Sequence, residues 1–516
     1  MLAVTLGVLA LAVRVLLVVR AGGLAGIDGY DGGVYYAAAT SLLWGRVPYA
    51  HFLLLHPPGI MLLLMPFAVL GRLTADSVGF EAARGVSLLV GAVDAALLVV
   101  VARRGGLGRA GAVTAGVLYA LWTPAVMAET TIRLEPWVTL ALLGALVALV
   151  TPGRRPTRAH LVVAGCCLAL AVSVKIWAAA PAVFLLLWCW RRWGPRVLAP
   201  VLLGGTLAAL LVDLPFFVAA PGEMWRMVVL DQLGRGRTSV SGPQRLLTTL
   251  LDGRPVDVSS PAGHLAAGGV AVVLCLAAVA AVRTPVGRFA LGLLGVQLAV
   301  LALSPSFYSY YPAYAAPTVA LLLGAAVGQV AHRVCQGRSW GPARHRSRPV
   351  TARLVLVGVG AILATAAVVD TRVTIRMPFP ATAVAADAAG ARCVTSDSPD
   401  ALMLTNLYSR DLARGCRAPV DLSGLSYDVF APPRLSLEQP VSSRAYNVRW
   451  QHHLVGYLRG GQMIFIMRAA DDGVSPLLRH RVLQLPKVAA GRGYRLYDNA
   501  GRQVRASGPR VTPARL

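Results

Sequence analysis

The sequence predicts an all-α polytopic membrane protein with about eleven transmembrane helices and a small C-terminal α/β domain outside the cytoplasm. Three observations lead to this prediction. Of the 516 residues, 56% are hydrophobic and only 14% are charged, whereas a soluble domain has about 25% charged residues. Long apolar runs recur from residue 2 to residue 369, and arginines collect in every second loop between them.

The apolar runs give the predicted helices, because a helix needs about 20 apolar residues to cross a bilayer. Two runs, 37–44 and 60–70, are too short and are flanked by glycine and proline, so we expect them to be helices on the outer membrane surface. The predicted spans are 2–19, 86–101, 110–126, 137–150, 161–174, 178–190, 197–218, 266–282, 289–303, 314–330 and 354–369.

The loop charges predict the orientation of these spans. The net charge is +26, but the arginines lie in short loops at 103–109, 154–158, 191–196, 283–288 and 333–353. Basic loops of membrane proteins face the cytoplasm. The pattern therefore predicts a multi-pass plasma-membrane protein with a cytoplasmic N-terminus. No basic face interleaved with aromatic residues is evident, so the chain is not expected to bind nucleic acid.

The chain divides into two predicted domains. Residues 1–372 form the transmembrane domain, whose first outer loop is 21–80, and residues 373–516 form the soluble domain outside the cytoplasm. In the tail we expect strands near 391–395, 462–467 and 494–501, and a helix that starts at Pro399 with Ser398 as its cap. Cys393 and Cys416 are the only cysteines of the tail, and in an oxidising compartment they are expected to form a disulfide.

Charged and aromatic residues collect in the loops that are predicted to face outside. Cations on that face run against the usual charge rule, so they indicate an anionic partner at the membrane surface, such as the phosphate of a lipid. A nearby carboxylate could act as a general base toward an acceptor hydroxyl. The candidate residues are Asp28, Asp31, Tyr35, His56, Arg133, Glu135, Lys175, Arg237 and Tyr311.

Several of these segments resemble the GT-C glycosyltransferases that use polyprenyl-phosphate sugars. The run 31–35 (DGGVY), followed by 45–49 (GRVPY) and 56–58 (HPP), is similar to the first outer loop of actinobacterial mannosyl- and arabinofuranosyltransferases. It is also similar to that loop in the protein O-mannosyltransferase and aminoarabinose transferase group. In those families an aspartate four residues before a tyrosine is the presumed base. Asp31 with Tyr35 matches this spacing, and Asp28 is the second candidate.

Later segments follow the same resemblance in order. Residues 133–136 (RLEP) resemble the acidic motif of the second outer loop, Lys175 resembles the lysine at the outer end of the fifth span, and 308–312 resemble the aromatic and proline start of a late span. The resemblance implies transfer of a sugar, mannose or another hexose or pentose, from a polyprenyl-phosphate donor with inversion. The implied acceptor is a cell-envelope glycolipid, polysaccharide or protein.

The resemblance implies no cofactor. Gly32 stands where a second acid next to Asp31 is usual, and no metal-ligand spacing occurs, so a divalent metal is possible but not indicated. Simpler interpretations stay open: Asp31 and His56 could be turn residues, Glu135 could begin a helix, and Lys175 could reach toward the membrane interface. The alternative function is a secondary transporter or lipid flippase, with Asp94 and Asp213 as its intramembrane acids.

Overall fold

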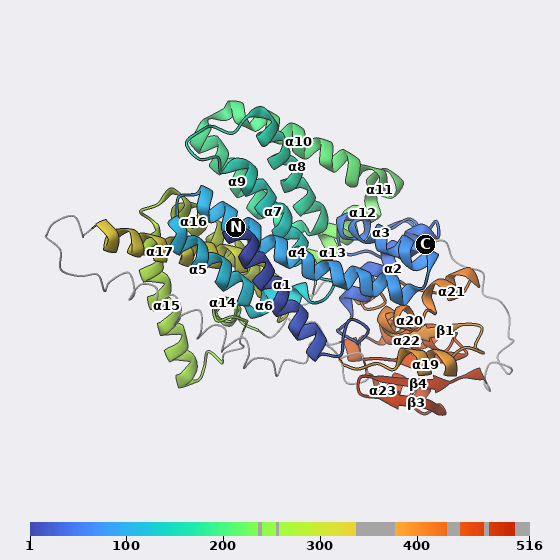
Figure 1. Ribbon diagram of the computed structural model, residues 1–516. Coiled ribbons are helices and arrows are strands. Elements are labelled where there is room, and N and C mark those ends of the chain that lie inside the picture. The colour runs from blue at the N-terminus through green and yellow to red at the C-terminus, as the bar shows by residue number, and fades with distance from the viewer. Residues whose placement is uncertain (236–239, 254–256, 337–376, 431–443, 469–473, 501–516) are drawn as a thin grey trace. The chain divides into compact units, whose positions relative to one another are not determined.

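The computed structural model describes residues 1–235, 240–253, 257–336, 377–430, 444–468 and 474–500. The described chain is mostly helical, and its one four-stranded sheet comes from the C-terminal part (Figure 1). The chain forms two compact units. Unit 1 comprises Met1–Leu24, Leu54–Leu63 and Ala82–Ile375, and unit 2 comprises Ala25–Leu53, Leu64–Glu81 and Arg376–Leu516. The predicted domain boundary at 372/373 lies outside the described residues and stays a prediction.

Long apolar helices make up most of unit 1. Five are long and apolar enough to cross a membrane: α1 (Leu2–Arg20), α4 (Asp76–Arg104), Pro195–Val212 containing α10 (Leu198–Val212), α15 (Pro261–Ala281) and α16 (Pro285–Leu303). A sixth is possible if the pair α5 (Gly108–Leu121) and α6 (Thr123–Glu129), bent by 58°, is one span. The chain is therefore a multi-pass membrane protein.

The bend between α5 and α6 has a local cause. Trp122 is extended (φ −66°, ψ 112°) and Pro124 lies in the first turn of α6. Proline lacks the backbone N–H that would donate to the carbonyl four residues earlier, so the hydrogen-bond ladder of α5 cannot continue through Pro124. The sequence prediction treated 110–126 as one uninterrupted run, so the break is a finding of the structure.

The other described helices of the first 336 residues are shorter or follow the same runs. They are α2 (Asp31–Leu43), α3 (Gly59–Leu73), α7 (Glu135–Leu149), α8 (Arg158–Val174), η1 (Ile176–Ala178), α9 (Ala179–Trp193), η2 (Pro195–Val197), α11 (Leu214–Ala219), α12 (Pro221–Trp225), η3 (Arg226–Leu230), α13 (Asp231–Leu233), α14 (Gly242–Leu250), η4 (Tyr311–Tyr314) and α17 (Ala316–Gln336).

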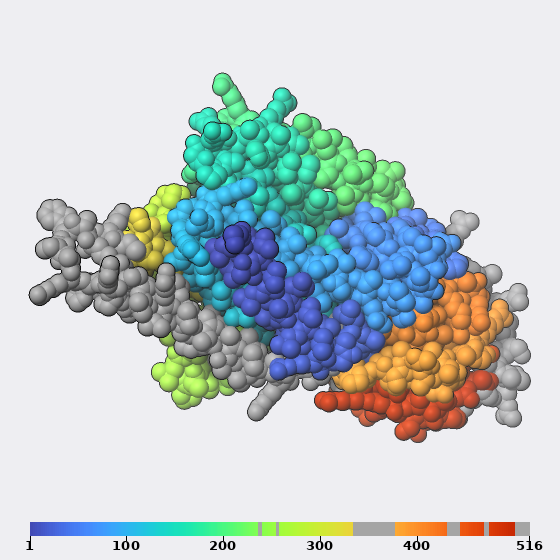
Figure 2. All heavy atoms as spheres, in the orientation of Figure 1, coloured from blue at the N-terminus to red at the C-terminus, as the bar shows by residue number. Residues whose placement is uncertain are grey.

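The apolar runs therefore predicted helices well. The run 197–218 is divided at Asp213 into α10 and α11. The last predicted span, 354–369, lies outside the described residues, and the number eleven stays a prediction. Large apolar side chains are exposed along α1, α10 and α15, for example Val4, Leu211 and Leu265, and Figure 2 shows α1 open along the visible face. Such faces suit a bilayer, where lipid tails replace water as the solvent.

Unit 2 contains the sheet, whose strand order is β1-β2-β4-β3. Strand β1 (Val394–Ser396) is parallel to β2 (Met463–Ile466), β2 is antiparallel to β4 (Tyr494–Asp498), and β4 is antiparallel to β3 (Lys487–Gly491). Strands β1 and β2 are entirely buried, whereas β3 is an exposed edge. The predicted strands at 391–395, 462–467 and 494–501 are confirmed as β1, β2 and β4, and β3 was not predicted.

Helices cover this sheet. Trp450, Leu454 and Leu458 of α22 (Val448–Leu458) pack with Ile464 of β2 and Tyr497 of β4 in a buried apolar cluster. The remaining elements of the tail are α19 (Ala381–Asp387), α20 (Pro399–Leu404), α21 (Tyr408–Ala413), η6 (Gly424–Ser426), η7 (Arg444–Tyr446) and α23 (Pro476–Arg481). The small α/β fold expected for the tail is present.

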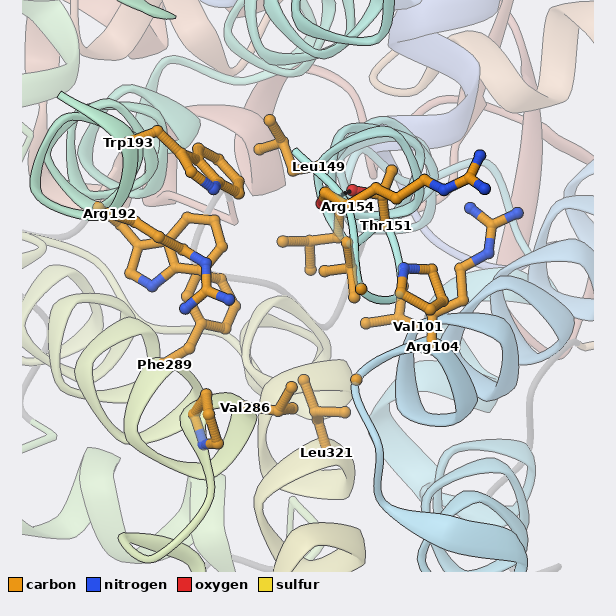
Figure 3. A pocket seen from close by; sticks show the side chains of 17 residues that line it. Val101, Arg104, Leu149, Thr151, Arg154, Arg192, Trp193, Val286, Phe289 and Leu321 are labelled. Atoms are coloured by element: carbon orange, nitrogen blue, oxygen red, sulfur yellow. Dashed lines mark hydrogen bonds between the residues drawn. The ribbon is translucent and has the colours of Figure 1, made fainter. Parts of the chain in front are cut away.

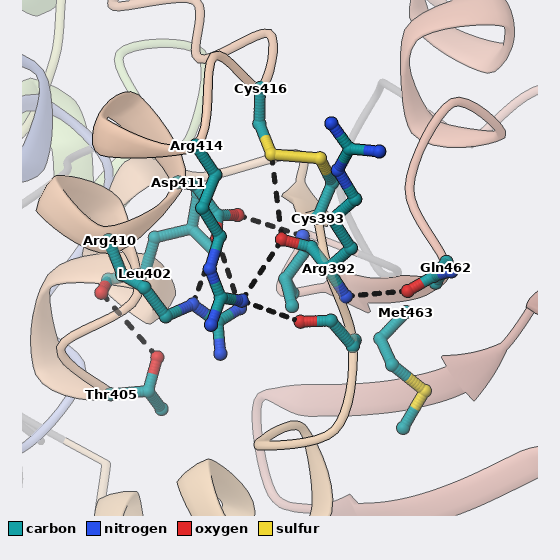
Figure 4. Close-up of polar contacts among 12 residues, drawn as sticks. Arg392, Cys393, Leu402, Thr405, Arg410, Asp411, Arg414, Cys416, Gln462 and Met463 are labelled. Carbon is teal, nitrogen blue, oxygen red and sulfur yellow. Dashed lines mark hydrogen bonds and ion pairs between the residues drawn. A yellow bond between two sulfur atoms is a disulfide. The ribbon is translucent and has the colours of Figure 1, made fainter.

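Two predictions about the tail can be checked directly. The disulfide between Cys393 and Cys416 is confirmed, with Cα atoms 5.8 Å apart (Figure 4). Ser398 does stand before α20, but its side chain makes no capping hydrogen bond. The predicted cap position is therefore confirmed, but the capping hydrogen bond expected from this residue is absent. Pro399 in the first turn, which needs no hydrogen-bond partner for its nitrogen, accounts for the helix start.

Candidate functional site

Asp31 is the first residue of α2, not a loop residue. It is half-buried, and Tyr35 follows one turn later and is 5% exposed. Residues four apart lie on one face of a helix, so the predicted pair shares a face of α2. A carboxylate in the first turn is also stabilised by the positive end of the helix dipole. Asp28 is half-buried and precedes the helix.

Most of the first outer loop, residues 25–53 and 64–80, folds together with the tail to form unit 2. The Tyr30 hydroxyl donates to Oδ1 of Asp421 (2.9 Å) and accepts from the backbone N–H of Ser423 (2.9 Å), while the Arg468 guanidinium lies 4.6 Å from the centre of the Tyr30 ring. Burial raises the pKa of Tyr30 well above its ordinary value, and the Asp421 carboxylate raises it further. Tyr30 therefore remains a hydrogen-bond donor.

More contacts of the same kind were not visible in the sequence, because their partners are over 300 residues apart. They include Arg46 Nη1 to the Ala418 carbonyl (2.8 Å), Ser41 Oγ with the Tyr408 hydroxyl (3.0 Å), the Ser409 N–H to Asp76 Oδ2 (2.8 Å) and the backbone bridge between Ile27 and Met377. The helix that carries Asp31 is thus fixed by the tail.

Gly33 of the predicted motif has a packing role in unit 2. A Cβ atom on Gly33 would lie 2.8 Å from the backbone nitrogen of Asp400 and closer still to that residue's carboxylate. Asp400 is fully buried at the start of α20. Only glycine lets α2 and α20 come this close, so Gly33 fixes how the helix with Asp31 is held.

In unit 1, the segment with His56 runs over the end of α8. Gly59 starts α3, and a Cβ on it would lie 2.5 Å from the Ser173 carbonyl oxygen. The Gln232 side-chain amide donates to the carbonyl of Leu55. His56 is half-buried. The HPPG run is therefore packed directly against the helix turn that precedes Lys175.

Lys175 ends α8 with an extended backbone (φ −148°, ψ 120°). Its Nζ donates to Oε1 of Glu135 across 2.6 Å, and the side chains of the two residues are only 4% and 2% exposed. The same Nζ lies 4.1 Å from the ring centre of Trp177 and 4.5 Å from that of Tyr311. We call these four residues the Lys175 cluster. A buried charge needs such compensation, which an ion pair and two ring faces supply together.

Neighbouring elements hold the partners of Lys175. Glu135 begins α7, with Pro136 in the first turn, so the interpretation of this residue as a helix start is confirmed. The same carboxylate still binds Lys175. The Trp177 and Tyr311 rings meet edge to face at 4.7 Å, and the Tyr314 hydroxyl donates to the Trp177 carbonyl (2.9 Å). The cluster is thus built from three separate parts of unit 1.

Arg133 reaches the same aromatic segment. Its guanidinium lies 4.1 Å from the centre of the Tyr310 ring, and Tyr310 meets Tyr311 edge to face at 5.1 Å. A guanidinium that lies on a ring keeps its N–H groups at the edge, where they can still bind a planar anion. The structure therefore brings Arg133, Glu135, Lys175 and Tyr311 into one part of unit 1.

Arg245 has a role that sequence reasoning missed. It is 4% exposed and donates to the carbonyls of Val240 (2.9 Å), Ser304 and Pro305 (3.3 Å). These bonds fix the turn that leads into the aromatic segment 308–311. Arg237, the predicted cation of this loop, lies outside the described residues, so its role stays a prediction.

A buried polar network also lies within unit 1. Arg14 of α1 pairs with Glu129 at the end of α6 and donates to the Ala120 carbonyl (2.9 Å). The Tyr119 hydroxyl donates to Oε1 of Glu129 (2.6 Å). Asp94 Oδ2 lies 3.4 Å from the same Tyr119 hydroxyl. Arg14 and Asp94 are fully buried and Glu129 is 1% exposed. In the sequence, Arg14 and Asp94 are single charges inside apolar runs, which gave no sign that they meet.

Among the described ranges, no group of three or more His, Cys, Asp or Glu side chains could hold a metal ion. The expectation that no cofactor takes part stays a prediction.

Comparison with known proteins bears on this part of the chain. Residues 64–223 match the family of dolichyl-phosphate-mannose-protein mannosyltransferases. The matched range contains Arg133, Glu135 and Lys175 and ends before the aromatic segment. The predicted resemblance to the GT-C glycosyltransferases is thereby confirmed. No curated protein sequence matches the chain significantly.

Solved structures share the fold over nearly the whole chain. ArnT from Cupriavidus metallidurans in the apo state is 17% identical, covers 98% of this chain and 99% of its own, and has a TM-score of 0.54. The same enzyme bound to undecaprenyl phosphate is 17% identical, covers 98% of this chain and 99% of its own, and has a TM-score of 0.51. An oligosaccharyltransferase from Archaeoglobus fulgidus in complex with Zn and sulfate is 12% identical. It covers 97% of this chain and 73% of its own, and has a TM-score of 0.50. The chain thus has an ArnT-like fold.

Proposed function

We propose that this protein transfers a sugar from a polyprenyl-phosphate donor to a hydroxyl group of a cell-envelope acceptor. The Lys175 cluster carries the proposal, because a lysine that is held nearly fully buried by Glu135 and two aromatic rings is an unusual and costly feature of a membrane protein. The cluster begins in the range matched by the mannosyltransferase family. An enzyme of the same fold binds undecaprenyl phosphate, which supports a lipid phosphate as the anion.

Asp31 is proposed as the general base. It removes the proton of the acceptor hydroxyl while that oxygen attacks the anomeric carbon of the sugar. The bond between the anomeric carbon and the phosphate oxygen breaks, and polyprenyl phosphate leaves with the electron pair. A single displacement of this kind inverts the anomeric configuration. Asp31 is suited to this role because it is half-buried and lies in the first turn of α2.

Lys175 and Arg133 are proposed to bind the donor phosphate. Both are cations placed against aromatic rings, and a charge-assisted hydrogen bond from either would stabilise the leaving phosphate. Glu135 pairs with Lys175 and directs its Nζ. His56 and Tyr311 are proposed to shape the sugar-binding region, and mannose is the first donor sugar to test.

The transport alternative has little structural support. A transporter would use acidic side chains in mid-membrane. Asp94 instead lies in the buried network with Arg14 and Glu129, and Asp213 accepts a hydrogen bond from Ser173 Oγ (2.5 Å). The assay for transfer includes a direct test of transport.

The test uses the purified full chain in lipid with polyprenyl-phosphate mannose, arabinofuranose and glucose, each with extracted cell-envelope acceptors. Release of polyprenyl phosphate together with sugar transfer is expected for one donor. We expect Asp31→Asn to lower kcat by 10²–10⁴-fold, and Asp28→Asn to lower it much less. Wild-type turnover in Asp31→Asn would exclude the base assignment, and donor movement across liposomes without transfer would favour transport.

A matched pair of lysine variants tests the cation. Lys175→Met is expected to raise KM for the donor and lower kcat. Lys487→Met removes the only other lysine of the chain, which lies in the exposed edge strand β3, and is expected to leave both constants unchanged.

A further inference from the structure

One end of the unit 1 helices is strongly basic and has no acidic residue in its loops. The loops 103–109, 151–158, 191–196 and 283–288 contain eleven arginines and no aspartate or glutamate. Positive loops set membrane orientation, so single exposed arginines here need no further explanation. Arginines that line a cavity need a further explanation, because the cavity defines the place where an anionic partner would bind.

A cavity of about 170 Å³ lies at this end of unit 1, between the ends of α4, α7 and α9 and the first turns of α16 (Figure 3). Its loop side includes Gly105, which packs so closely on Val286 that a side chain there would meet it. The residues that give the cavity its chemistry are Arg104, Arg154, Arg192, Trp188, Trp193 and Phe289.

Three arginines thus reach one cavity from three separate segments: Arg104 from the end of α4, Arg192 from the last turn of α9 and Arg154 from the loop after α7. Arg192 lies 5.6 Å from the ring centre of Trp188 and 5.7 Å from that of Trp193. In Figure 3, Arg192 is on the aromatic side, and Arg104 and Arg154 are on the opposite side, where their guanidinium groups lie near each other and extend away from the aromatic wall. Arg104 donates one hydrogen bond to the Val147 carbonyl (2.7 Å), which leaves its other N–H groups available. No acidic residue is among those that line the cavity in the described part of the chain.

The aromatic side is a rigid wall. Trp188 meets Trp193 edge to face at 5.2 Å and Phe289 at 5.1 Å. Tryptophan prefers the level of lipid headgroups, because one side of its ring is apolar and its N–H is polar. The cavity therefore combines an interfacial aromatic wall with guanidinium groups, which are the preferred ligands of phosphate oxygens.

We propose that this cavity binds the phosphate headgroup of an anionic phospholipid, and that the apolar side chains of Val101, Leu146 and Leu149 contact the start of its acyl chains. Two neighbouring hollows continue the same basic surface, one lined by Arg191 and Arg288 and the other by Arg155, Arg158 and Arg196. Basic pockets between membrane helices are suited to such headgroups.

The lipid site is separate from the Lys175 cluster. Helix α7 has Glu135 at its first residue and Leu149 at its last, and 15 helical residues span about 22 Å. The two sites are at opposite ends of this helix. The lipid site consequently does not depend on the proposed reaction, and binding can be measured without any turnover.

The experiment measures lipid retention by the full chain with native mass spectrometry and titration in nanodiscs. Phosphatidylglycerol is compared with phosphatidylcholine, which has no net charge, and with inorganic phosphate. The pocket variant is Arg104→Gln/Arg154→Gln/Arg192→Gln. The control variant is Arg103→Gln/Arg109→Gln/Arg283→Gln, which removes the same charge from three arginines of the same face. These are exposed, as the pocket arginines are, but they do not line the cavities.

We expect the wild type to retain phosphatidylglycerol over phosphatidylcholine. One charge-assisted contact contributes roughly tenfold in affinity, so the pocket variant should bind at least about 100-fold more weakly, while the control variant binds as the wild type does. Equal losses in the two variants would mean diffuse attraction and overturn the proposal. Equally tight binding of inorganic phosphate and phosphatidylglycerol would mean that the cavity binds free anions, and this would also overturn the proposal.

A third variant guards against misfolding. Thr151→Trp fills the cavity, which Thr151 lines, and keeps every arginine. It should lower phosphatidylglycerol binding about tenfold or more while the protein stays monodisperse. Unchanged binding in this variant would contradict a headgroup inside the cavity.

Discussion

Lys175 and Glu135 form a buried ion pair, with Nζ 2.6 Å from Oε1, between the end of α8 and the start of α7. The side chains are 4% and 2% exposed, so neither charge can turn to solvent if its partner is removed. The ion pair therefore contributes to the packing of α7 and α8 and also places the cation of Lys175 in the cluster. Mutation of one or both residues can separate the effect on stability from the effect on donor binding.

The first prediction concerns this pair. Lys175→Met leaves the Glu135 carboxylate buried without its counter-ion and should lower the free energy of unfolding by about 3–5 kcal/mol. The double variant Lys175→Met/Glu135→Leu should recover most of that stability, because no buried charge remains. Thermal unfolding in one detergent measures both. If the pair serves the proposed function, the stable double variant still fails to bind the donor. Donor binding by the double variant would make the pair purely structural.

The second prediction concerns Arg14 and Glu129. Arg14→Leu leaves Glu129 and Asp94 in a fully buried place without their cation, and we expect a loss of about 3–5 kcal/mol. Arg14→Lys keeps the charge but loses the guanidinium geometry, so it should be intermediate. Arg20→Leu, at the exposed end of the same helix, is the matched control. Equal melting temperatures for Arg14→Leu and Arg20→Leu would contradict the network.

The third prediction tests the close approach at Gly33. Gly33→Ala forces a methyl group against Asp400 in unit 2, so α2 and α20 must move apart. Overpacking of this kind costs roughly 1–3 kcal/mol. Gly390→Ala is the control, since a Cβ there would meet nothing within 4 Å. Limited proteolysis of the tail should detect the loosened packing in Gly33→Ala only.

The sequence predicted the helices of unit 1 because a bilayer imposes a simple pattern, a long apolar run between polar loops. It predicted the disulfide because the tail holds only Cys393 and Cys416. It also selected Arg133, Glu135, Lys175 and Tyr311 separately, and these share one part of unit 1.

What the sequence could not predict depends on distant contacts. Arg14 looked like a single charge in an apolar run, because its partner is 115 residues away. Asp31 looked like a loop residue, because the helix that it starts is held by tail residues far along the chain. Ser398 has the residue type of a helix cap, yet its hydroxyl makes no such bond. At each of these positions the local sequence pattern predicts one environment, and contacts with distant residues give the side chain a different one.

The fourth prediction concerns acid sensitivity of unit 2. His453 of α22 is half-buried, and its ring lies 4.7 Å from that of Phe430. Burial lowers the pKa of His453, and the charge of Arg417 lowers it further. The unfolded chain therefore binds this proton more readily than the folded chain does. The contribution of neutral His453 to the stability of the folded chain is fully present above the ordinary histidine pKa of about 6.5. It is lost as the pH falls through the lower pKa that His453 has in the folded chain.

The measurement is the melting temperature of the full chain between pH 7.5 and 5. The wild type should lose stability on acidification, and His453→Gln, which has no proton to bind, should lose less. His452→Gln removes the neighbouring exposed histidine and should follow the wild-type curve. An identical acid response in His453→Gln and the wild type would assign the sensitivity to another group.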